Sequence, residues 1–339
     1  MSAYTITRRR LLNTAAAGVA AFAWGPRLAL SQERLKQATI VVGSPPGGAT
    51  DKLTRMYAEG LRERYASTVL VENKPGAGGA IAYEYVKNSG LKDGSLMFLS
   101  PAYPIVISPH VARNLPYDPI KDFVPVGIGA RSMLTLVVGP AVPESVKTLS
   151  DYVQWCRDNP KQAVYAAQTG SSQHLAGASF SLAAKLPWEN VSYKGDAPGV
   201  QDVLGGHMPA IILPIASAIT HHKSGKMRVL AATGAKRSRF LPDVPTLQEL
   251  GYRDILFQDW LGVFAPAGTP ADVIQRINDA MAAVVNTEQG RQTLTTMGFE
   301  PDHASPADFA AMVKADHARY GEVVKRVNFQ ETVEKATGK

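Results

Sequence analysis

The segment Ser44-Pro45-Pro46-Gly47-Gly48-Ala49-Thr50-Asp51 decides the fold, together with a second glycine-rich segment, Asn73-Lys74-Pro75-Gly76-Ala77-Gly78-Gly79. Each segment follows a short apolar run, at 39–42 or 69–71, and each precedes a stretch with helical patterning. A strand that turns through glycine into a helix leaves several backbone N–H groups without partners at the helix start. These donors and the positive end of the helix dipole suit an anion. The two turns therefore predict a site for a small carboxylate or phosphate compound.

Strand-like and helix-like segments alternate along the whole chain, which predicts an α/β protein with mainly parallel sheets. Strands are expected at 39–42, 69–72, 96–99, 134–138, 163–167, 209–215, 228–233 and 260–265. Helices are expected at 52–65, 80–88, 145–157, 173–185, 196–204 and 269–285. No repeat and no low-complexity linker is visible. The domain boundaries are therefore expected where the chain crosses between packed lobes.

The composition is that of an ordinary globular protein, with 45% hydrophobic and 19% charged residues. At 339 residues the chain is long enough for two domains. The formal charge is +7, but residues 1–31 contribute four arginines and no acid, so residues 32–339 carry only +3. This charge is too small to indicate nucleic-acid binding, and no basic run is interleaved with aromatic residues. No nucleic-acid partner is expected.

The first 31 residues have the pattern of an export signal. The basic cluster Arg8-Arg9-Arg10 precedes an alanine-rich apolar segment at 11–24, which is too short to span a bilayer. Small residues before Gln32 allow cleavage between Ser31 and Gln32. The adjacent arginines favour a twin-arginine signal, with a Sec signal as the alternative. The mature protein is therefore expected in the periplasm.

Two further turns in the middle of the chain also contain glycine and precede a predicted helix. Gln168-Thr169-Gly170-Ser171-Ser172-Gln173-His174 follows a predicted strand and precedes a helix, so its hydroxyl and N–H groups can bind an anion. Tyr193-Lys194-Gly195-Asp196-Ala197 leads into the helix predicted at 196–204, which Asp196 can cap. Any one of these turns can be an ordinary strand-to-helix connection. Four of them, two in each half of the chain, favour a shared anion site.

The sequence lacks the motifs of dinucleotide-binding, nucleotide-hydrolysing, nucleophilic and metal sites. Gly76-Ala77-Gly78 resembles the start of a dinucleotide-binding fingerprint, but Ile81 stands at the third glycine position. The sequence contains no Walker A motif, no nucleophile elbow and no zinc-ligand pattern. His221 and His222 are adjacent, so on a helix they would point about 100° apart and could not hold one metal. We therefore expect no catalytic residue, no metal and no cofactor.

Several side chains near the predicted loops have two interpretations each. His174 is expected to form a hydrogen bond at a helix start rather than to act as a base. Lys194 can pair with a ligand carboxylate or face solvent. Asp259 can meet a ligand ammonium group or hold a loop, and Trp260 after it is expected in the core.

Beyond the two glycine-rich segments, five more segments carry a resemblance. They are His174-Leu175-Ala176, Tyr193-Lys194-Gly195, Asp202-Val203-Leu204-Gly205-Gly206, Leu241-Pro242-Asp243-Val244-Pro245-Thr246 and Ala265-Pro266-Ala267-Gly268-Thr269-Pro270. In number and order these segments resemble the extracytoplasmic solute receptors of tripartite tricarboxylate transporters, the Bug or TctC family. The resemblance extends from about residue 39 to about residue 327.

The resemblance implies a type II periplasmic-binding-protein fold, in which two α/β lobes enclose a ligand cleft and the chain crosses between them twice. Crossings are expected near 132–138 and 258–263, with residues 32–134 and 258–339 in the first lobe and 135–257 in the second. In the family, the first loop and a serine-bearing loop of the other lobe hold the ligand carboxylate. The residues expected to bind the ligand are Ser44, Pro46, Gly47, Gly48, Ala49, Thr50, Asp51, Gly76, Ala77, Gly78, Thr169, Gly170, Ser171, Ser172, His174, Lys194, Gly195, Asp196 and Asp259.

Three positions depart from the family pattern. Ser44 stands where an aromatic residue is common, Ser192 where a proline is common, and Pro209 where an acidic residue is common. Loss of the aromatic residue would widen the pocket, and loss of the acid would remove a partner for a ligand amine. An unaminated carboxylate is therefore slightly favoured over an acidic amino acid.

The predicted function is the capture of a small mono-, di- or tricarboxylate by a monomeric receptor that presents it to membrane transporter subunits. The alternative is a receptor that signals to a membrane sensor kinase, because both outputs would use the same pocket. An enzyme on the same fold is disfavoured, because the loops carry no nucleophile, metal-ligand set or cofactor motif.

Overall fold

The computed structural model describes residues 34–337, so the predicted export signal lies outside the described residues. Within them, nine strands join in the order β2-β1-β3-β9-β4-β7-β5-β6, and β8 pairs with β4. The strands are β1 (Leu35–Val42), β2 (Ala66–Asn73), β3 (Leu96–Pro101), β4 (Phe123–Val138), β5 (Val164–Ala167), β6 (Glu189–Ser192), β7 (Ala210–Pro214), β8 (Arg228–Ala232) and β9 (Gln258–Pro266).

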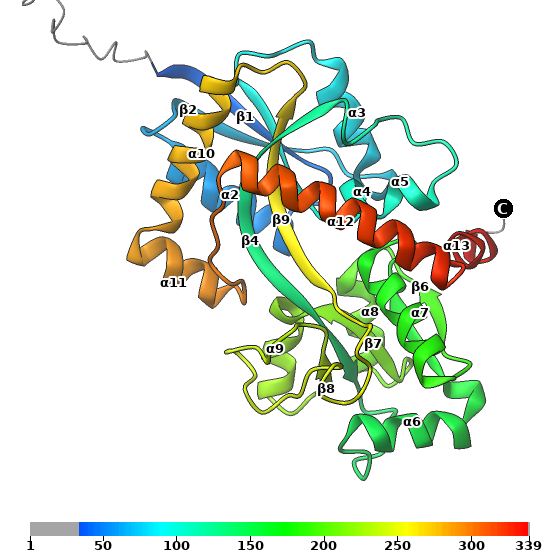
Figure 1. Cartoon of the computed structure of the whole chain (residues 1–339). Helices are drawn as coiled ribbons and strands as arrows, with labels where there is room; N and C mark the ends of the chain where they lie inside the picture. Colours follow the sequence, from blue (N-terminus) through cyan, green and yellow to red (C-terminus); the bar gives the residue numbers. More distant parts are fainter. Residues whose placement is uncertain (1–33, 338–339) are drawn as a thin grey trace, which may run out of the picture. The chain divides into compact units, whose positions relative to one another are not determined.

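The long strands β4 and β9 join the two lobes (Figure 1). The first part of β4, from Phe123 to Met133, pairs with β9, and its last part, from Leu134 to Val138, pairs with β7 and β8. The chain therefore leaves the first lobe along β4 and returns along β9. This confirms the predicted fold of two α/β lobes with two crossings. We propose that the first lobe comprises residues 32–134 and 258–339 and the second lobe residues 135–257.

The expectation of mainly parallel sheets is wrong. Parallel pairing joins β1 to β2 and β3, and β5 to β6 and β7. Antiparallel pairing joins β9 to β3 and β4, and β4 to β7 and β8. The antiparallel pairs arise because β4 and β9 carry the chain between the lobes in opposite directions. Apolar runs in a sequence do not reveal the direction in which a strand pairs.

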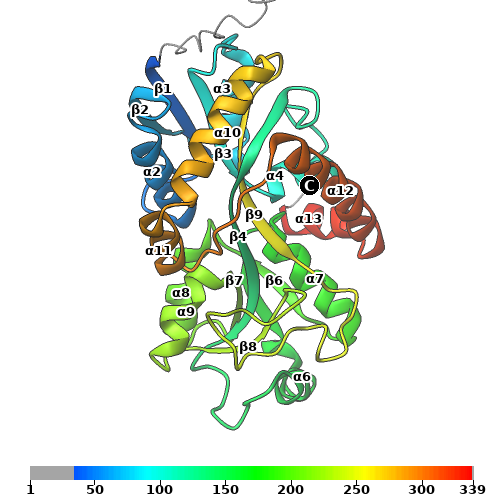
Figure 2. The ribbon, with the colours of Figure 1, turned by 60° about the vertical axis from the view of Figure 1, so that its left-hand side comes forward.

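Helices cover the sheet of each lobe. The α-helices are α2 (Ala49–Leu61), α3 (Ala80–Asn88), α4 (Tyr103–Val106), α5 (Ser108–Val111), α6 (Leu149–Asp158), α7 (Ser172–Ala184), α8 (Asp196–Leu204), α9 (Ile215–Lys223), α10 (Ala271–Val285), α11 (Glu288–Thr296), α12 (Pro306–Arg326) and α13 (Phe329–Thr337). Short 3₁₀ helices lie at η1 (Ala77–Gly79) and η2 (Pro160–Gln162). Figure 2 shows α10 beside α2 in the first lobe, and α8 and α9 beside β7 in the second.

Four predicted helices have other bounds in the structure, and for α7 and α10 the difference is only one or two residues. The helix expected at 52–65 begins at Ala49 and ends at Leu61, and Glu63 after it has a left-handed φ of 65°. The helix expected at 145–157 begins only at Leu149, because Thr148 and Asp151 form a reciprocal capping box. The short strand β6 and the helices α4, α5, α9, α11, α12 and α13 were not expected.

Aromatic side chains fill the centre of the first lobe. Phe98 and Phe264 stack with their ring centroids 5.3 Å apart, and Phe309 meets Trp260 edge-on with the centroids 5.2 Å apart. Trp260 is fully buried, and its Nε1–H donates to Asp316. Its expected place in the core is confirmed. Among residues 34–337, no helix combines the length and the apolar character that a membrane crossing requires.

Candidate functional site

The ends of several strands meet at one edge of the first lobe. In the register of the sheet, Val42 of β1 lies beside Asn73 of β2 and Leu99 of β3, and Pro101 at the end of β3 lies beside Leu261 of β9. The loops that follow β1, β2 and β3 therefore leave the sheet at the same edge, close to Asp259 near the start of β9. In open α/β sheets, ligands bind beyond the carboxyl ends of the strands.

The first loop presents the start of α2. Gly47 has a left-handed φ of 87°, whereas Gly48, the N-cap of α2, has an ordinary extended backbone with φ −73° and ψ 171°. No side chain caps this helix. The N–H groups of its first turn have no partners within the helix, so they can donate to an anion. Pro46 and Gly48 are exposed, and Ala49 and Thr50 are partly exposed.

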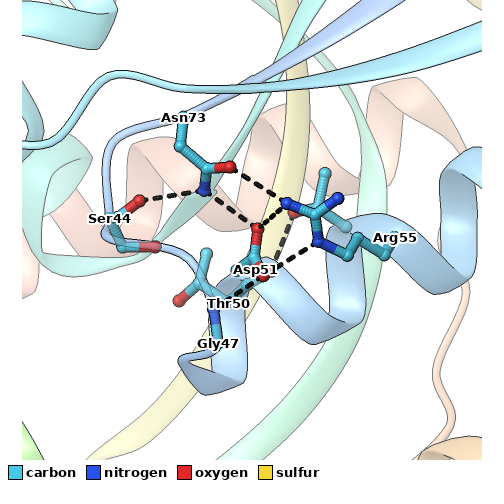
Figure 3. Close-up of polar contacts among 7 residues, drawn as sticks. Ser44, Gly47, Thr50, Asp51, Arg55 and Asn73 are labelled. Carbon is cyan, nitrogen blue, oxygen red and sulfur yellow. Dashed lines mark hydrogen bonds and ion pairs between the residues drawn. The ribbon is translucent and has the colours of Figure 1, made fainter.

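Asp51 holds this loop from within the protein (Figure 3). Its Oδ2 accepts hydrogen bonds from the Gly47 N–H at 2.8 Å and from Arg55 Nε at 3.0 Å. Its Oδ1 accepts from Asn73 Nδ2 at 2.9 Å and lies 3.0 Å from Arg55 Nη2. Asn73 Nδ2 also donates to the carbonyl oxygen of Ser44 at 3.1 Å. The Asp51 side chain is only 2% exposed, so we assign it to positioning the loop rather than to ligand contact.

The pKa of Asp51 follows from these bonds. Burial alone would raise the pKa, but the hydrogen bonds from Arg55, Gly47 and Asn73 outweigh it and hold the pKa below its usual value. The carboxylate therefore stays ionised at neutral pH. Sequence reasoning missed Arg55 and Asn73, although the spacing of four residues between Asp51 and Arg55 on a helix is a signal for such a pair.

The second loop lies against the first. A Cβ on Gly43 would stand only 2.8 Å from the Cα of Gly79, so the two backbones touch. Gly76, Ala77 and Gly78 all have positive φ values, of 131°, 48° and 66°. This left-handed run is the reason that glycine is needed in the loop.

Tyr103 connects this second loop to the other lobe. Its hydroxyl donates to the Gly78 carbonyl oxygen at 3.0 Å and accepts from Gln168 Nε2 at 3.3 Å. Neither Tyr103 nor Gln168 was among the expected site residues.

The serine-bearing loop of the second lobe is largely bonded to itself. Ser171 caps α7: its Oγ accepts from the His174 N–H at 3.3 Å and donates to the Gln168 carbonyl oxygen at 2.6 Å. Gly170 has a left-handed φ of 81°, and its N–H donates to His174 Nδ1 at 3.2 Å. Thr169 Oγ1 donates to Ser192 Oγ at 2.8 Å.

These bonds change what the loop can offer to a ligand. The Ser171 side chain is 1% exposed, and its hydroxyl is already used as donor and acceptor. His174 is 1% exposed, and burial lowers its pKa to about 4, so its ring is neutral at physiological pH. As expected from the sequence, the His174 ring forms a hydrogen bond at the helix start, where its Nδ1 accepts from the Gly170 N–H. The groups that remain to bind an anion are the N–H groups in the first turn of α7, which begins at Ser172.

The third element of the second lobe is the start of α8. The expectation that Asp196 caps this helix is wrong, because Gly195, with φ 99°, is the N-cap and Asp196 is the first helical residue. The carboxylate of Asp196 instead accepts from Gln173 Nε2 at 3.2 Å and Ser217 Oγ at 3.3 Å, which ties the starts of α7, α8 and α9 together. Burial raises its pKa to about 6. Lys194 is exposed beside this turn.

The lobes meet at Asp259. Its Oδ2 accepts a hydrogen bond of 3.5 Å from Ser172 Oγ. This bond joins β9 to the start of α7 in the second lobe. Its Oδ1 is buried and has no hydrogen-bond partner among the described residues, and the same holds for Oγ of Ser44 in the first loop. Buried polar atoms of this kind are rare in native proteins and call for an explanation.

The structure thus brings together most of the residues expected from the sequence, at one edge of each lobe. Two surface hollows lie elsewhere: one is lined by residues of α5, α12 and α13, and the other lies around Arg131 and Arg319. Neither contains an expected ligand-binding residue. Among the described residues, no group of three or more His, Cys, Asp or Glu side chains is placed to hold a metal ion.

The chain is similar to known proteins over most of its length. The model of the tripartite tricarboxylate transporter family receptor matches residues 53–329. The chain is 29% identical to protein BugT of Bordetella pertussis over 287 residues, which cover 84% of this chain and 87% of BugT. It is 30% identical to a UPF0065 protein of Agrobacterium vitis, over 84% of this chain and 83% of that one.

Solved structures of similar proteins share the fold of this chain. An R. palustris protein with adipate is 32% identical, with a TM-score of 0.80, and the match covers 86% of this chain and 97% of that one. The periplasmic binding protein BugD is 28% identical, with a TM-score of 0.78 and the same coverage.

Proposed function

Because the chain belongs to the receptor family of the tripartite tricarboxylate transporters, a family of periplasmic solute-binding proteins and not of enzymes, we propose that it captures a small carboxylate for uptake by such a transporter. The observation that carries the proposal is the uncapped start of α2, which lies beside the turns after β2 and β3 and close to Asp259. The adipate in the related R. palustris structure supports the ligand class.

The proposed ligand site consists of the first-turn N–H groups of α2 and α7, with Ser44 and Asp259 as the side chains that still have an unpaired polar atom. Backbone donors recognise a carboxylate and leave the rest of the ligand to the surrounding side chains. Output to a membrane sensor kinase is the alternative to transport, since both would read the same bound state of the two lobes.

The ligand class is tested by thermal denaturation with a panel of mono-, di- and tricarboxylates, each with and without an amino group. A ligand that binds only the folded protein raises its stability by RT ln(1 + [L]/Kd), about 2.7 kcal/mol at a hundredfold excess over Kd. We expect at least one acid to raise the melting temperature clearly. Stabilisation by sugars or by cationic amino acids alone would contradict the proposal.

We also propose export by the twin-arginine route. Replacing Arg8 and Arg9 together by lysine keeps the charge but is expected to abolish accumulation in the periplasm, as measured by immunoblotting of cell fractions. Normal accumulation of this variant would instead support the Sec alternative.

A further inference from the structure

Asp259 is the one acidic side chain of the site whose bonds are incomplete among the described residues. Asp51 has partners on both oxygens, and so does Asp196. Among the described residues, Ser172 is the one side-chain donor to Asp259, at 3.5 Å, and the N–H groups of Trp260 and Ala102 lie near the carboxylate. Its buried Oδ1 nevertheless has no hydrogen bond of normal geometry. A carboxylate oxygen withdrawn from water without a hydrogen bond is costly. Such a group is expected to find its donor in something that the described chain does not supply.

The surroundings of Asp259 favour a cation. The titratable groups that act on it or feel its charge are Asp196 at the start of α8, Tyr103 of α4 and Tyr320 of α12. None of these groups is a cation. Burial, and in smaller part the nearby charge of Asp196, raises the pKa of Asp259 to about 7, while the Ser172 hydroxyl and the N–H groups of Trp260 and Ala102 oppose this rise.

We propose, on the premise of the proposed function, that Asp259 is a specificity-determining residue that receives the ammonium group of an amino-carboxylate ligand. The ligand carboxylate then lies at the start of α2 and its ammonium group meets Oδ1 of Asp259. An ammonium group supplies up to three N–H donors and a charge-assisted bond to a carboxylate. It would satisfy the orphaned oxygen and offset the two neighbouring negative charges at once.

An ammonium group at Asp259 makes an aminated acid the preferred ligand, whereas the sequence slightly favoured an unaminated acid. That preference depended on the missing acid at Pro209, whereas the structure supplies an acid at the site from β9. An unaminated dicarboxylate would bring a second negative charge into surroundings that already hold Asp259 and Asp196, and like charges at short range repel. The aminated acid carries one negative charge fewer.

The test is isothermal titration calorimetry with three matched pairs: L-aspartate and succinate, L-glutamate and glutarate, L-alanine and propionate. For at least one pair, the wild-type protein should bind the aminated acid about 10- to 100-fold more tightly, which is the range expected for one charge-assisted hydrogen bond. Asp259→Asn should remove this preference. Asp243→Asn, which removes the same charge from an exposed position on the second lobe, should retain it.

The pH dependence gives a second readout. Binding of an aminated acid should tighten from pH 5.5 to pH 8, because Asp259 loses its proton in that interval while the ligand amine stays protonated. A role for Asp259 as a proton donor to a ligand carboxylate requires the opposite trend, with affinity falling as pH rises. Asp259→Ser is a second variant that removes the charge, and the melting temperature of each variant without ligand reports whether it folds.

The outcomes separate the two proposals. Equal or tighter binding of the unaminated acids, or an amino preference that survives in both Asp259 variants, overturns this inference and leaves the proposed function standing. Failure of every acid of either kind to bind overturns the proposed function, and this inference with it.

Discussion

Replacing Asp51 by alanine is expected to lower the free energy of unfolding by about 2–4 kcal/mol and to abolish tight ligand binding. The substitution leaves the Gly47 N–H without its acceptor, removes one of the two acceptors of Asn73 Nδ2, and leaves Arg55 without its carboxylate partner. Arg55 is 52% exposed, so the ion pair itself contributes about 1 kcal/mol or less, and most of the effect comes from the bonds to Gly47 and Asn73. Urea denaturation and calorimetry measure the two effects.

Two controls show whether the hydrogen bonds are responsible. Arg55→Ala removes only the exposed partner and should cost about 1 kcal/mol or less. The stabilisation from Asp51 should also depend on pH, because its folded pKa lies below its unfolded value. The contribution is present above the unfolded pKa of about 3.9 and is lost as pH falls through the folded pKa, so wild type and Asp51→Ala should converge in acid. An Asp51→Ala variant with wild-type stability and affinity would contradict the role that we assign to this carboxylate.

Gly48→Val is expected to leave the fold intact and to weaken ligand binding about 100-fold or more. Gly48 has an extended backbone that any residue adopts, and the nearest atom to a Cβ there is the Pro45 carbonyl oxygen at 3.8 Å. Of the two neighbouring glycines, only Gly47 has a left-handed φ. The isopropyl group would instead stand over the first-turn N–H groups of α2 and cost the ligand two or more hydrogen bonds. Calorimetry with the natural ligand measures the loss.

The matched comparison is Ser171→Ala, at the helix start of the other lobe. Because the Ser171 hydroxyl caps α7, this change should cost about 1 kcal/mol of stability and reduce affinity less than tenfold. Gly48→Val should show the reverse pattern, with a cost in stability of about 1 kcal/mol or less and a large loss of affinity. Gly48→Val with wild-type affinity and a normal melting temperature would show that the start of α2 is not the carboxylate site.

Helices with glycine at both ends were predicted best. The predicted bounds of α3 and α8 agree with the structure, because glycines flank both helices and stop the helical pattern clearly. The long strand β4 was predicted only from Leu134 onward. Its first half contains Gly127 and Gly129 and changes register twice against β9, which weakens the alternation that marks a strand. A Cβ on Gly129 would press on the Tyr57 ring and the Leu261 carbonyl oxygen, both at 3.2 Å.

The loops of the site could be located from sequence, but the roles of their side chains could not. The glycine pattern predicts where backbone donors are exposed, because the rule depends only on local geometry. Whether Asp51 faces a ligand or the protein depends in part on Asn73, 22 residues along the chain. The partners of Ser171 are local, but the sequence does not show whether its hydroxyl is used by Gln168 and His174 or left for a ligand. The sequence cannot predict the unpaired oxygen of Asp259, because this feature depends on how β9 and α7 pack together.

Native mass spectrometry of the protein purified from the periplasm shows directly whether it holds a carboxylic acid at the start of α2. The wild-type protein should carry an added mass equal to that of a small carboxylic acid, and Gly48→Val, purified in parallel and folded, should carry none. An added mass that belongs to a sugar or a cation, or the same acid retained by Gly48→Val at wild-type occupancy, would contradict a carboxylate site at the start of α2.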